Sequence, residues 1–238
     1  MKTFGLIGKN LSHSFSAQYF NEKFLIEGIS NTQYLNFELT NLTDFKELTQ
    51  KNKLSGVNVT IPYKETIIPL LDELNEEAKI IGAVNTIRFN NGKLIGYNTD
   101  HIGFRISIIP LLKGRKKAII LGNGGAAKAI KYALNKLGIK YKTVSRNTRF
   151  DYYNITKEIT NSYTIIINTT PLGSYPNINN YPLIPYEYLT KNHLLFDLIY
   201  NPKETKFLSY GKAQHAQTKN GLEMLKIQAE ESWNIWNL

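Results

Sequence analysis

The 238-residue sequence contains no cysteine, only four histidines, and no apolar run near the ~20 residues that a transmembrane helix needs. Without cysteine, disulfides, thiol nucleophiles and thiolate metal sites are excluded. The histidines are scattered and match no metal-ligand spacing, so we expect no metal. Residues 1–8 have too short an apolar run for a signal peptide and are predicted to form a strand. We therefore expect a cytoplasmic protein without a membrane partner.

Acidic residues are also scarce. The chain has 19 Asp and Glu against 29 Lys and Arg, a formal net charge of +10. Nucleic-acid-binding proteins usually gather such charge on one face or in runs, but the one dense cluster here is Lys113–Lys117. The other basic residues are spread along the chain. The charge therefore favours a solvated basic surface that attracts anionic substrates and cofactors, and we expect no nucleic-acid partner.

A glycine-rich turn is the most informative feature that is present. Residues 118–121 are apolar, and Gly122, Gly124 and Ala127 follow with G-x-G-x-x-G/A spacing. The first glycine allows the tight turn, the second clears space for a phosphate, and the small third residue lets the helix pack closely on the strand. Residues 128–137 are predicted to form that helix. This strand, turn and helix predict a dinucleotide site with the pyrophosphate at the helix N-terminus.

The following strand, predicted at residues 140–144, distinguishes between the two nicotinamide cofactors. An NAD site usually places Asp or Glu about 20 residues after the glycines, to bind the ribose 2′-hydroxyl. Here no acid occurs before Asp151, and Arg146 and Arg149 stand in its place. A guanidinium can pair bidentately with a 2′-phosphate. Arg146, directly after the strand, therefore favours NADP, whereas Arg149 fits a basic surface loop equally well.

Strand-like and helix-like segments alternate along the whole chain, which is typical of α/β proteins with parallel sheets. We predict strands at 3–7, 32–38, 56–60, 164–168 and 194–198, a hairpin of 83–89 with 93–97, and helices at 16–27, 42–52, 62–71, 101–112 and 221–236. Two such blocks predict two domains with a cleft between them. Residues 1–100, joined by the C-terminal segment 219–238, would bind the substrate and perform catalysis. Residues 101–218 would form a Rossmann-like, doubly wound NADP-binding domain.

Four polar segments lie in apolar surroundings in the first block: Asn10–Ser16, Asn58–Lys64, Gly82–Thr86 and Gly96–Asp100. Ligands of open α/β sheets collect at strand ends of this kind. A purely structural role is possible for several of the residues, since Ser14 and Ser16 could cap a helix and Asn85 and Asp100 could cap turns. Lys64 is predicted at the start of a helix, where the helix dipole disfavours a cation.

In their order, these segments resemble the motifs of the shikimate dehydrogenase family, which are S-x-S, N-V-T-x-P-x-K, G-A-x-N-T and G-x-N-T-D. The later features of that family are present as well: Gly122–Ala126, Asn168–Gly173, Asp197–Pro202 and Gly221–Gln228. The resemblance therefore extends from the first predicted strand to the last predicted helix.

The resemblance implies NADPH-dependent, reversible reduction of 3-dehydroshikimate to shikimate, a step toward chorismate and the aromatic amino acids, by a monomer or homodimer. Lys64 and Asp100 would be the catalytic pair. Substrate would contact Ser14, Ser16, Thr60, Asn85, Asp100, Tyr200 and Gln228. NADP(H) would contact Gly122, Asn123, Gly124, Gly125, Ala126, Ser145, Arg146, Asn147, Thr169, Gly221 and Met224. Tyr200 and Gly221 would lie near the nicotinamide, with Met224 packing close by.

The chain departs from the family pattern in the loop after the second cofactor-domain strand, where N-R-T-x-x-R/K is often found. The sequence here is Ser-Arg-Asn-Thr-Arg-Phe over residues 145–150, and the segment from 145 to 168 is compact, so a helix there would be short or absent. The main alternative is a quinate/shikimate dehydrogenase that uses NAD or both cofactors. A methylene-tetrahydrofolate dehydrogenase and a non-catalytic ligand or nucleic-acid binder are more distant alternatives, and Lys64 with Asp100 argues against the last.

Overall fold

The computed structural model describes residues 1–12, 14–145 and 150–238, which form two compact units. The first unit combines residues 1–99 with 229–238, and the second contains residues 100–228. The last helix, α8 (Leu222–Trp236), contributes to both units. The sequence analysis placed all of 219–238 with the first domain. In the structure Met224 belongs to a core of the second unit, whereas Ala229 and Trp236 belong to a core of the first.

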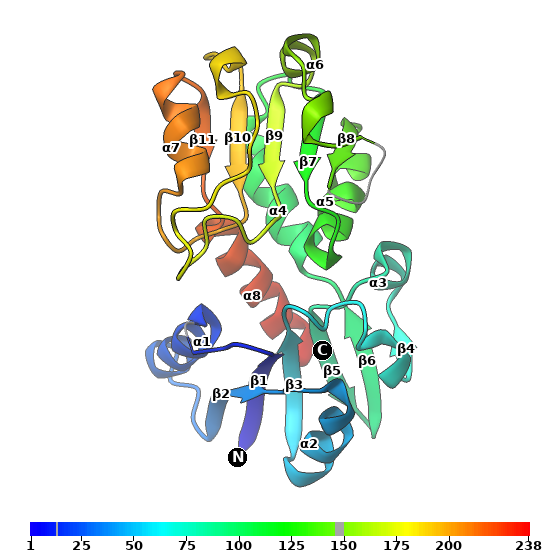
Figure 1. Cartoon of the computed structure of the whole chain (residues 1–238). Helices are drawn as coiled ribbons and strands as arrows, with labels where there is room; N and C mark the ends of the chain where they lie inside the picture. The colour runs from blue at the N-terminus through cyan, green and yellow to red at the C-terminus, as the bar shows by residue number, and fades with distance from the viewer. Residues whose placement is uncertain (13, 146–149) are drawn as a thin grey trace. The chain divides into compact units, whose positions relative to one another are not determined.

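The first unit contains a mixed sheet with strand order β2-β1-β3-β5-β6-β4 (Figure 1). Its strands are β1 (Lys2–Gly8), β2 (Thr32–Glu38), β3 (Leu54–Val59), β4 (Glu73–Leu74), β5 (Thr86–Asn90) and β6 (Lys93–Tyr97). β1 runs parallel to β2 and β3, and β5 runs antiparallel to β3 and β6. The predicted β5–β6 hairpin is confirmed, and its turn residues Asn91 and Gly92 both have positive φ, as a tight hairpin turn requires.

Two apolar cores cover the faces of this sheet, because successive strand side chains point to opposite faces. On β1, Phe4 and Leu6 pack in one core and Ile7 in the other. The helices of the unit are α1 (Phe15–Ile26), α2 (Phe45–Lys51) and α3 (Glu76–Ile81), with 3-10 turns at Leu42–Asp44 and Ile68–Leu70. Trp236 of α8 stacks on Phe4 with ring centroids 4.8 Å apart, so the C-terminal helix is part of this unit's core.

The prediction of a helix at residues 62–71 is wrong. The segment forms turns that end in the 3-10 helix Ile68–Leu70. The carbonyl of Lys64, which an α-helix would pair with residue 68, instead accepts from the Val84 N–H at 2.7 Å. Pro69 has no N–H to give to Glu65, whose carbonyl pairs with Ile68. Lys64 therefore lies in a turn, and the argument that a helix dipole acts on its charge does not apply.

The second unit contains a fully parallel five-stranded sheet of order β11-β10-β9-β7-β8 (Figure 1). The strands are β7 (Lys117–Leu121), β8 (Lys140–Val144), β9 (Ile165–Asn168), β10 (Leu194–Asp197) and β11 (Gln217–Lys219). From β7 the chain moves outward first to β8 and later, in the other direction, to β9. The order therefore reverses between β7 and β9, and open α/β sheets bind ligands at the carboxyl ends of the strands at such a point.

Both faces of the parallel sheet are buried, which explains why its strands are apolar throughout. Ile120 and Ile167 pack on one face with α4 (Asp100–Ile108), α5 (Gly125–Lys136) and the start of α8. Ile119 and Ile166 pack on the other with α7 (Lys206–Ala213). The short helix α6 (Lys157–Ser162) occupies the segment predicted to be compact. The sequence analysis missed α3, α7, β4 and β11, all of which are short. Further 3-10 turns lie at Ile109–Leu111, Tyr152–Asn154 and Tyr186–Tyr188.

Candidate functional site

The segments that carry Thr60, Lys64 and Asn85 are joined by backbone hydrogen bonds in the first unit. Thr60 directly follows β3, and its N–H donates to Ile7 of β1 at 2.9 Å. The Val59 N–H donates to the Asn85 carbonyl at 2.8 Å, and the Val84 N–H donates to the Lys64 carbonyl at 2.7 Å. Lys64 is half-buried and Asn85 is buried. The structure thus brings together three of the predicted site residues at one end of β3.

The side chain of Asn85 has a fixed orientation. Its Oδ1 accepts from the Thr99 N–H at 2.7 Å, and its Nδ2 donates to the Thr99 hydroxyl at 2.9 Å. A backbone N–H can only donate, so the oxygen and nitrogen of this amide cannot be exchanged. The next residue after Thr99 is Asp100, which begins α4 and is buried. The Asn85 side chain therefore does hydrogen-bond a neighbouring turn, as considered from the sequence, and these bonds fix the orientation of its amide.

Ser14 and Ser16 lie at the start of α1. Ser14 is the N-cap residue, and its hydroxyl accepts from the Ser16 N–H at 3.2 Å. The Ser16 side chain hydrogen-bonds the phenol of Tyr34, whose pKa is raised by burial. Both serines are half-buried. The capping interpretation is thus confirmed for Ser14, and neither contact bears on the predicted binding of a carboxylate.

The glycine-rich turn of the second unit has the geometry that the spacing predicts. Gly122 has φ +111°, and a Cβ there would lie 2.5 Å from the Thr169 hydroxyl. Gly124 is the exposed N-cap of α5, and a Cβ there would meet no atom within 4 Å. Gly125 and Ala126 open α5, and Ala127 is buried. The turn therefore leaves open space beside backbone N–H groups at the N-terminus of a twelve-residue helix.

The residues around this turn differ in how they are held. Thr169 follows β9, and its N–H and hydroxyl both donate to the Leu121 carbonyl, at 2.9 and 2.7 Å. The exposed Asn123 accepts from Lys131 at 2.5 Å. Ser145 directly follows β8 and is half-buried. The predicted contacts Arg146 and Asn147, together with Arg149, lie outside the described residues.

The remaining predicted residues lie near the ends of β10 and on α8. Gly221 is buried and donates its N–H to Ile199 at 3.0 Å, and a Cβ there would lie 2.1 Å from the Leu198 carbonyl. Tyr200 is half-buried two residues after Leu198. Met224 and Gln228 are buried on α8, and Met224 packs in a core of the unit. Gly221 is thus required by close backbone packing, whatever else it contacts.

Sequence reasoning overlooked Asp197, the last residue of β10. Its side chain is fully buried and accepts from Asn168 at 3.0 Å, from Thr205 at 2.6 Å and from the Ile199 N–H at 3.1 Å. Burial raises the pKa of Asp197 to about 6, although these three hydrogen bonds oppose the shift. The carboxylate joins the ends of β9 and β10 to the N-cap of α7. A charged residue inside an apolar strand was the signal that could have revealed it.

The first unit holds a second overlooked group, a network of buried neutral side chains. Asn58 is 4 % exposed and donates to the Asn85 carbonyl and the Ser232 hydroxyl, and it accepts from Tyr34. Thr86 is fully buried beside Asn58 and Ser232. Polar residues within a buried strand indicated Asn58 and Thr86. Ser232, on an amphipathic helix, gave no such signal.

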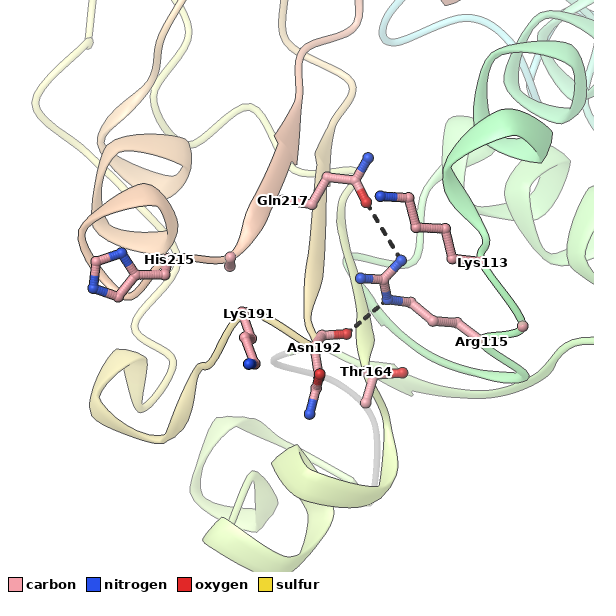
Figure 2. A pocket seen from close by; sticks show the side chains of 9 residues that line it. Lys113, Arg115, Thr164, Lys191, Asn192, His215 and Gln217 are labelled. Carbon is pink, nitrogen blue, oxygen red and sulfur yellow. Dashed lines mark hydrogen bonds between the residues drawn. The ribbon is translucent and has the colours of Figure 1, made fainter.

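A pocket of about 650 Å³ lies at the opposite, amino ends of the second unit's strands (Figure 2). Lys113, Arg115, Lys191 and His215 line it, so it takes up part of the basic cluster seen in the sequence. Arg115 donates to the carbonyls of Asn192 and Leu111 at 2.7 and 2.8 Å, and Figure 2 shows the His215 ring pointing away from it. The cations therefore do not converge, and Arg115 ties the start of β7 to the segment before β10. No predicted site residue lines this pocket.

No helix in the described part of the chain combines the length and apolar character needed to cross a membrane. Within the same residues, no group of three or more His, Cys, Asp or Glu side chains could hold a metal ion.

Comparison with known proteins agrees with both units. The family model for the shikimate dehydrogenase substrate binding domain matches residues 6–87. A shikimate dehydrogenase (NADP(+)) from Clostridium beijerinckii is 39% identical over 251 residues, which cover 99% of this chain and 92% of the relative.

Solved structures give the same result over the whole length. A shikimate dehydrogenase in complex with NADP+ is 36% identical, with a TM-score of 0.88, and the match covers 99% of this chain and 90% of that one. A quinate dehydrogenase from Corynebacterium glutamicum in complex with NAD is 26% identical, with a TM-score of 0.87, over 99% and 94% of the two chains. On the strength of the full-length match at 39% identity, the chain belongs to the shikimate dehydrogenase family.

Proposed function

We propose that this chain catalyses the reversible reduction of 3-dehydroshikimate to shikimate with NADPH. The observation that carries the proposal is the joining of Lys64 and Asn85 at the end of β3. The Val84 N–H holds the Lys64 carbonyl, and Thr99 orients the Asn85 amide. An ammonium and an oriented amide are thus presented from one region of the unit whose sequence matches the substrate-binding family model.

The chemistry of the reaction explains the roles proposed for Lys64 and Asp100. Reduction of a ketone builds negative charge on its oxygen, which requires a proton donor within hydrogen-bond reach. The Lys64 ammonium would donate that proton and would recover it from solvent or substrate afterwards. Asp100 would orient the ammonium and accept from a substrate hydroxyl. Ser14, Ser16, Thr60, Tyr200 and Gln228 would bind the carboxylate and the other hydroxyls.

NADP(H) supplies and accepts the hydride when bound, and the second unit has residues that fit it. Gly122 makes a turn that a side chain would obstruct, and the open space at Gly124 leaves room for a pyrophosphate at the start of α5. Asn123, Gly125, Ala126, Ser145, Thr169, Gly221 and Met224 would complete the contacts. Arg146 and Asn147 would bind the ribose 2′-phosphate.

The first experiment is to follow NADP+ reduction at 340 nm with shikimate, and to repeat it with NAD+ and with quinate. We expect turnover with shikimate and NADP+ to exceed the other pairs. Comparable rates with NAD+ or quinate would keep the chemistry and favour the quinate/shikimate alternative. Absence of turnover with every pair would contradict the proposed function.

The preference for NADP(H) depends on Arg146, so Arg146→Ala tests it separately. Loss of a guanidinium that pairs with the 2′-phosphate should raise KM for NADPH much more than KM for NADH. Arg115→Ala would be a poor control, because Arg115 supports the fold; the exposed Lys136, at the far end of α5, is a better one. Equal changes for both cofactors would remove the assignment of Arg146.

We also propose a cytoplasmic location and a monomeric or homodimeric state. Both rest on membership of a family of metabolic dehydrogenases. Cell fractionation and sedimentation of the purified chain test them directly.

A further inference from the structure

We propose that Ser232, which lies outside every motif, is a positioning residue that orients Asn85 for substrate through a chain of hydrogen bonds. This inference rests on the proposed function, in which Asn85 contacts the substrate. Ser232 is fully buried on α8. Its hydroxyl lies 2.9 Å from Asn58 Nδ2, 2.8 Å from the Thr86 hydroxyl and 3.3 Å from the Thr99 hydroxyl. One hydroxyl therefore joins the end of β3, the start of β5 and the residue before Asp100.

Two backbone groups fix the orientation of the amides at the two ends of this chain. Asn58 Nδ2 faces the Asn85 carbonyl at 3.1 Å, and a carbonyl can only accept. The Asn58 amide is therefore fixed with Nδ2 as donor, and its Oδ1 accepts from the Tyr34 hydroxyl at 2.8 Å. At the other end, the Thr99 N–H can only donate, which fixes Asn85 with Oδ1 as acceptor.

The hydroxyls between these two ends can link the two amides. Thr86 donates to Asn85 Oδ1 at 3.1 Å, which uses its single hydrogen. In that arrangement Ser232 donates to Thr86, and Asn58 Nδ2 donates to Ser232. The chain runs from Tyr34 through Asn58, Ser232 and Thr86 to Asn85.

The consequence concerns how the Asn85 amide is held. Its Oδ1 accepts from the Thr99 N–H and the Thr86 hydroxyl, and its Nδ2 donates to the Thr99 hydroxyl at 2.9 Å, so both ends of the amide are held in place. Loss of the Ser232 hydroxyl would loosen this orientation and weaken the contact proposed between Asn85 and the substrate. The members of the chain are neutral, and burial raises the pKa of Tyr34, which keeps the phenol protonated as the chain requires.

Ser232→Ala removes one link without adding volume. We expect KM for shikimate to rise about three- to tenfold, the effect of one lost hydrogen bond, while KM for NADP+ stays within about twofold. The matched control is Ser107→Ala. Ser107 is also a buried helical serine, but its hydroxyl donates only to Phe104 within its own helix, in the second unit. The control should lose comparable stability and keep KM for shikimate.

Tyr34→Phe tests the other end of the chain without altering α8. It removes the donor to Asn58 and keeps the ring that stacks on Phe20 at 4.6 Å. KM for shikimate should rise again, and the double variant should show less than the product of the two effects, because both act through Asn58. Tyr186→Phe, which removes a hydroxyl bonded to the Pro182 carbonyl in the second unit, is the control.

The outcomes separate this inference from the proposed function. Wild-type chain that fails to oxidise shikimate with NADP+ contradicts the function itself. Active wild type, with Ser232→Ala and Tyr34→Phe changing KM for shikimate no more than their controls, overturns the positioning role alone. Tyr34→Phe also removes the partner of the Ser16 side chain. If Ser232→Ala does not fold, Tyr34→Phe is therefore tested in a Ser16→Ala background, where a further rise in KM for shikimate supports the positioning role and an unchanged KM overturns it.

Discussion

The first unit has polar side chains at its strand ends, whereas the second has exposed backbone N–H groups there. Thr60, Lys64 and Asn85 follow or precede strands of the mixed sheet. At the ends of the parallel sheet, Gly122 and Gly124 remove side chains so that N–H groups can be approached. Side chains can transfer protons as well as bind, but amide N–H groups can only bind and orient. The difference fits proton transfer to a substrate in one unit and retention of a cofactor in the other.

The supports beneath these two surfaces also differ. In the first unit they are neutral amides and hydroxyls, centred on Asn58 and Ser232. In the second unit the strand ends are joined by a carboxylate, Asp197, which donors surround. Among the described residues no buried side-chain nitrogen or oxygen lacks a hydrogen-bond partner, so both supports are saturated. Of the groups named here, Asp197 is the one whose charge changes in the acidic range, because the pKa of Tyr34 is raised, so the two supports should respond differently to acid.

Removing the Lys64 side chain should have the largest effect, because it tests the claim that the first unit performs the proton transfer. Lys64→Ala should lower kcat by about 10²- to 10⁴-fold, the usual contribution of a general acid. Both substrates should still bind. Initial rates at saturating shikimate and NADP+, with circular dichroism to verify folding, measure this.

Lys79→Ala is the control for Lys64→Ala, since Lys79 is an exposed lysine of the same unit. It should leave kcat unchanged. A Lys64→Ala variant with near-wild-type kcat would show that another group donates the proton. It would then contradict the assignment of proton transfer to the side chains of the first unit.

Replacing a glycine of the turn before α5 with alanine should have the next largest effect. Gly124 and Gly122 distinguish a loss of cofactor binding from a loss of stability. Gly124→Ala is sterically allowed, so stability should change by less than ~1 kcal/mol. The new Cβ would occupy space beside the proposed pyrophosphate site. We expect KM for NADP+ to rise roughly tenfold, equivalent to about 1.4 kcal/mol, with KM for shikimate unchanged.

Gly122→Ala should instead destabilise the unit by about 1–3 kcal/mol, because φ +111° is unfavourable for alanine and the Cβ would meet Thr169. Urea unfolding of both variants distinguishes the two effects. If Gly124→Ala binds NADP+ as tightly as the wild type, the open space at α5 is not where the cofactor lies.

The sequence predicted the strands and the glycine turn well because each depends on local pattern. The hairpin at Asn91 and Gly92 and the apolar strand before Gly122 are set by neighbouring residues. The turn at Lys64 was mispredicted as a helix because its carbonyl pairs with Val84, twenty positions away. Distant pairing of this kind cannot be deduced from local spacing.

The candidate site also has a part that the sequence predicted and a part that required the structure. Motif residues such as Asn85 could be named from the sequence, but their orientation depends on partners that only the fold brings together, here Thr99 and, through Thr86, Ser232. Ser232 lies 174 positions from Asn58 and 146 from Thr86, so only the folded chain brings them together. Asp197 stood inside a quoted motif, yet its role as a structural carboxylate required knowledge of Asn168 and Thr205.

The smallest effect on activity, and the sharpest difference between the two supports, should come from Asp197→Asn. The folded-state pKa of about 6 lies above the usual value of 3.8, so between these values the folded state binds more protons than the unfolded state. Ionisation of Asp197 therefore lowers the free energy of unfolding as the pH rises from about 4 to about 6. The loss is complete above about pH 7 and amounts to at most about 3 kcal/mol.

Asparagine keeps an acceptor for Asn168 and Ile199 but cannot ionise, so this pH-dependent loss should vanish in the variant. The stability of the wild type relative to Asp197→Asn should fall between pH 4 and 7 and stay constant above that range, as measured by urea unfolding at each pH. Asp44→Asn, at an exposed site of the first unit, controls for the change in net charge. A relative stability that instead rose with pH would mean that the three donors outweigh burial and hold Asp197 ionised, as a favourable charged support rather than a costly one.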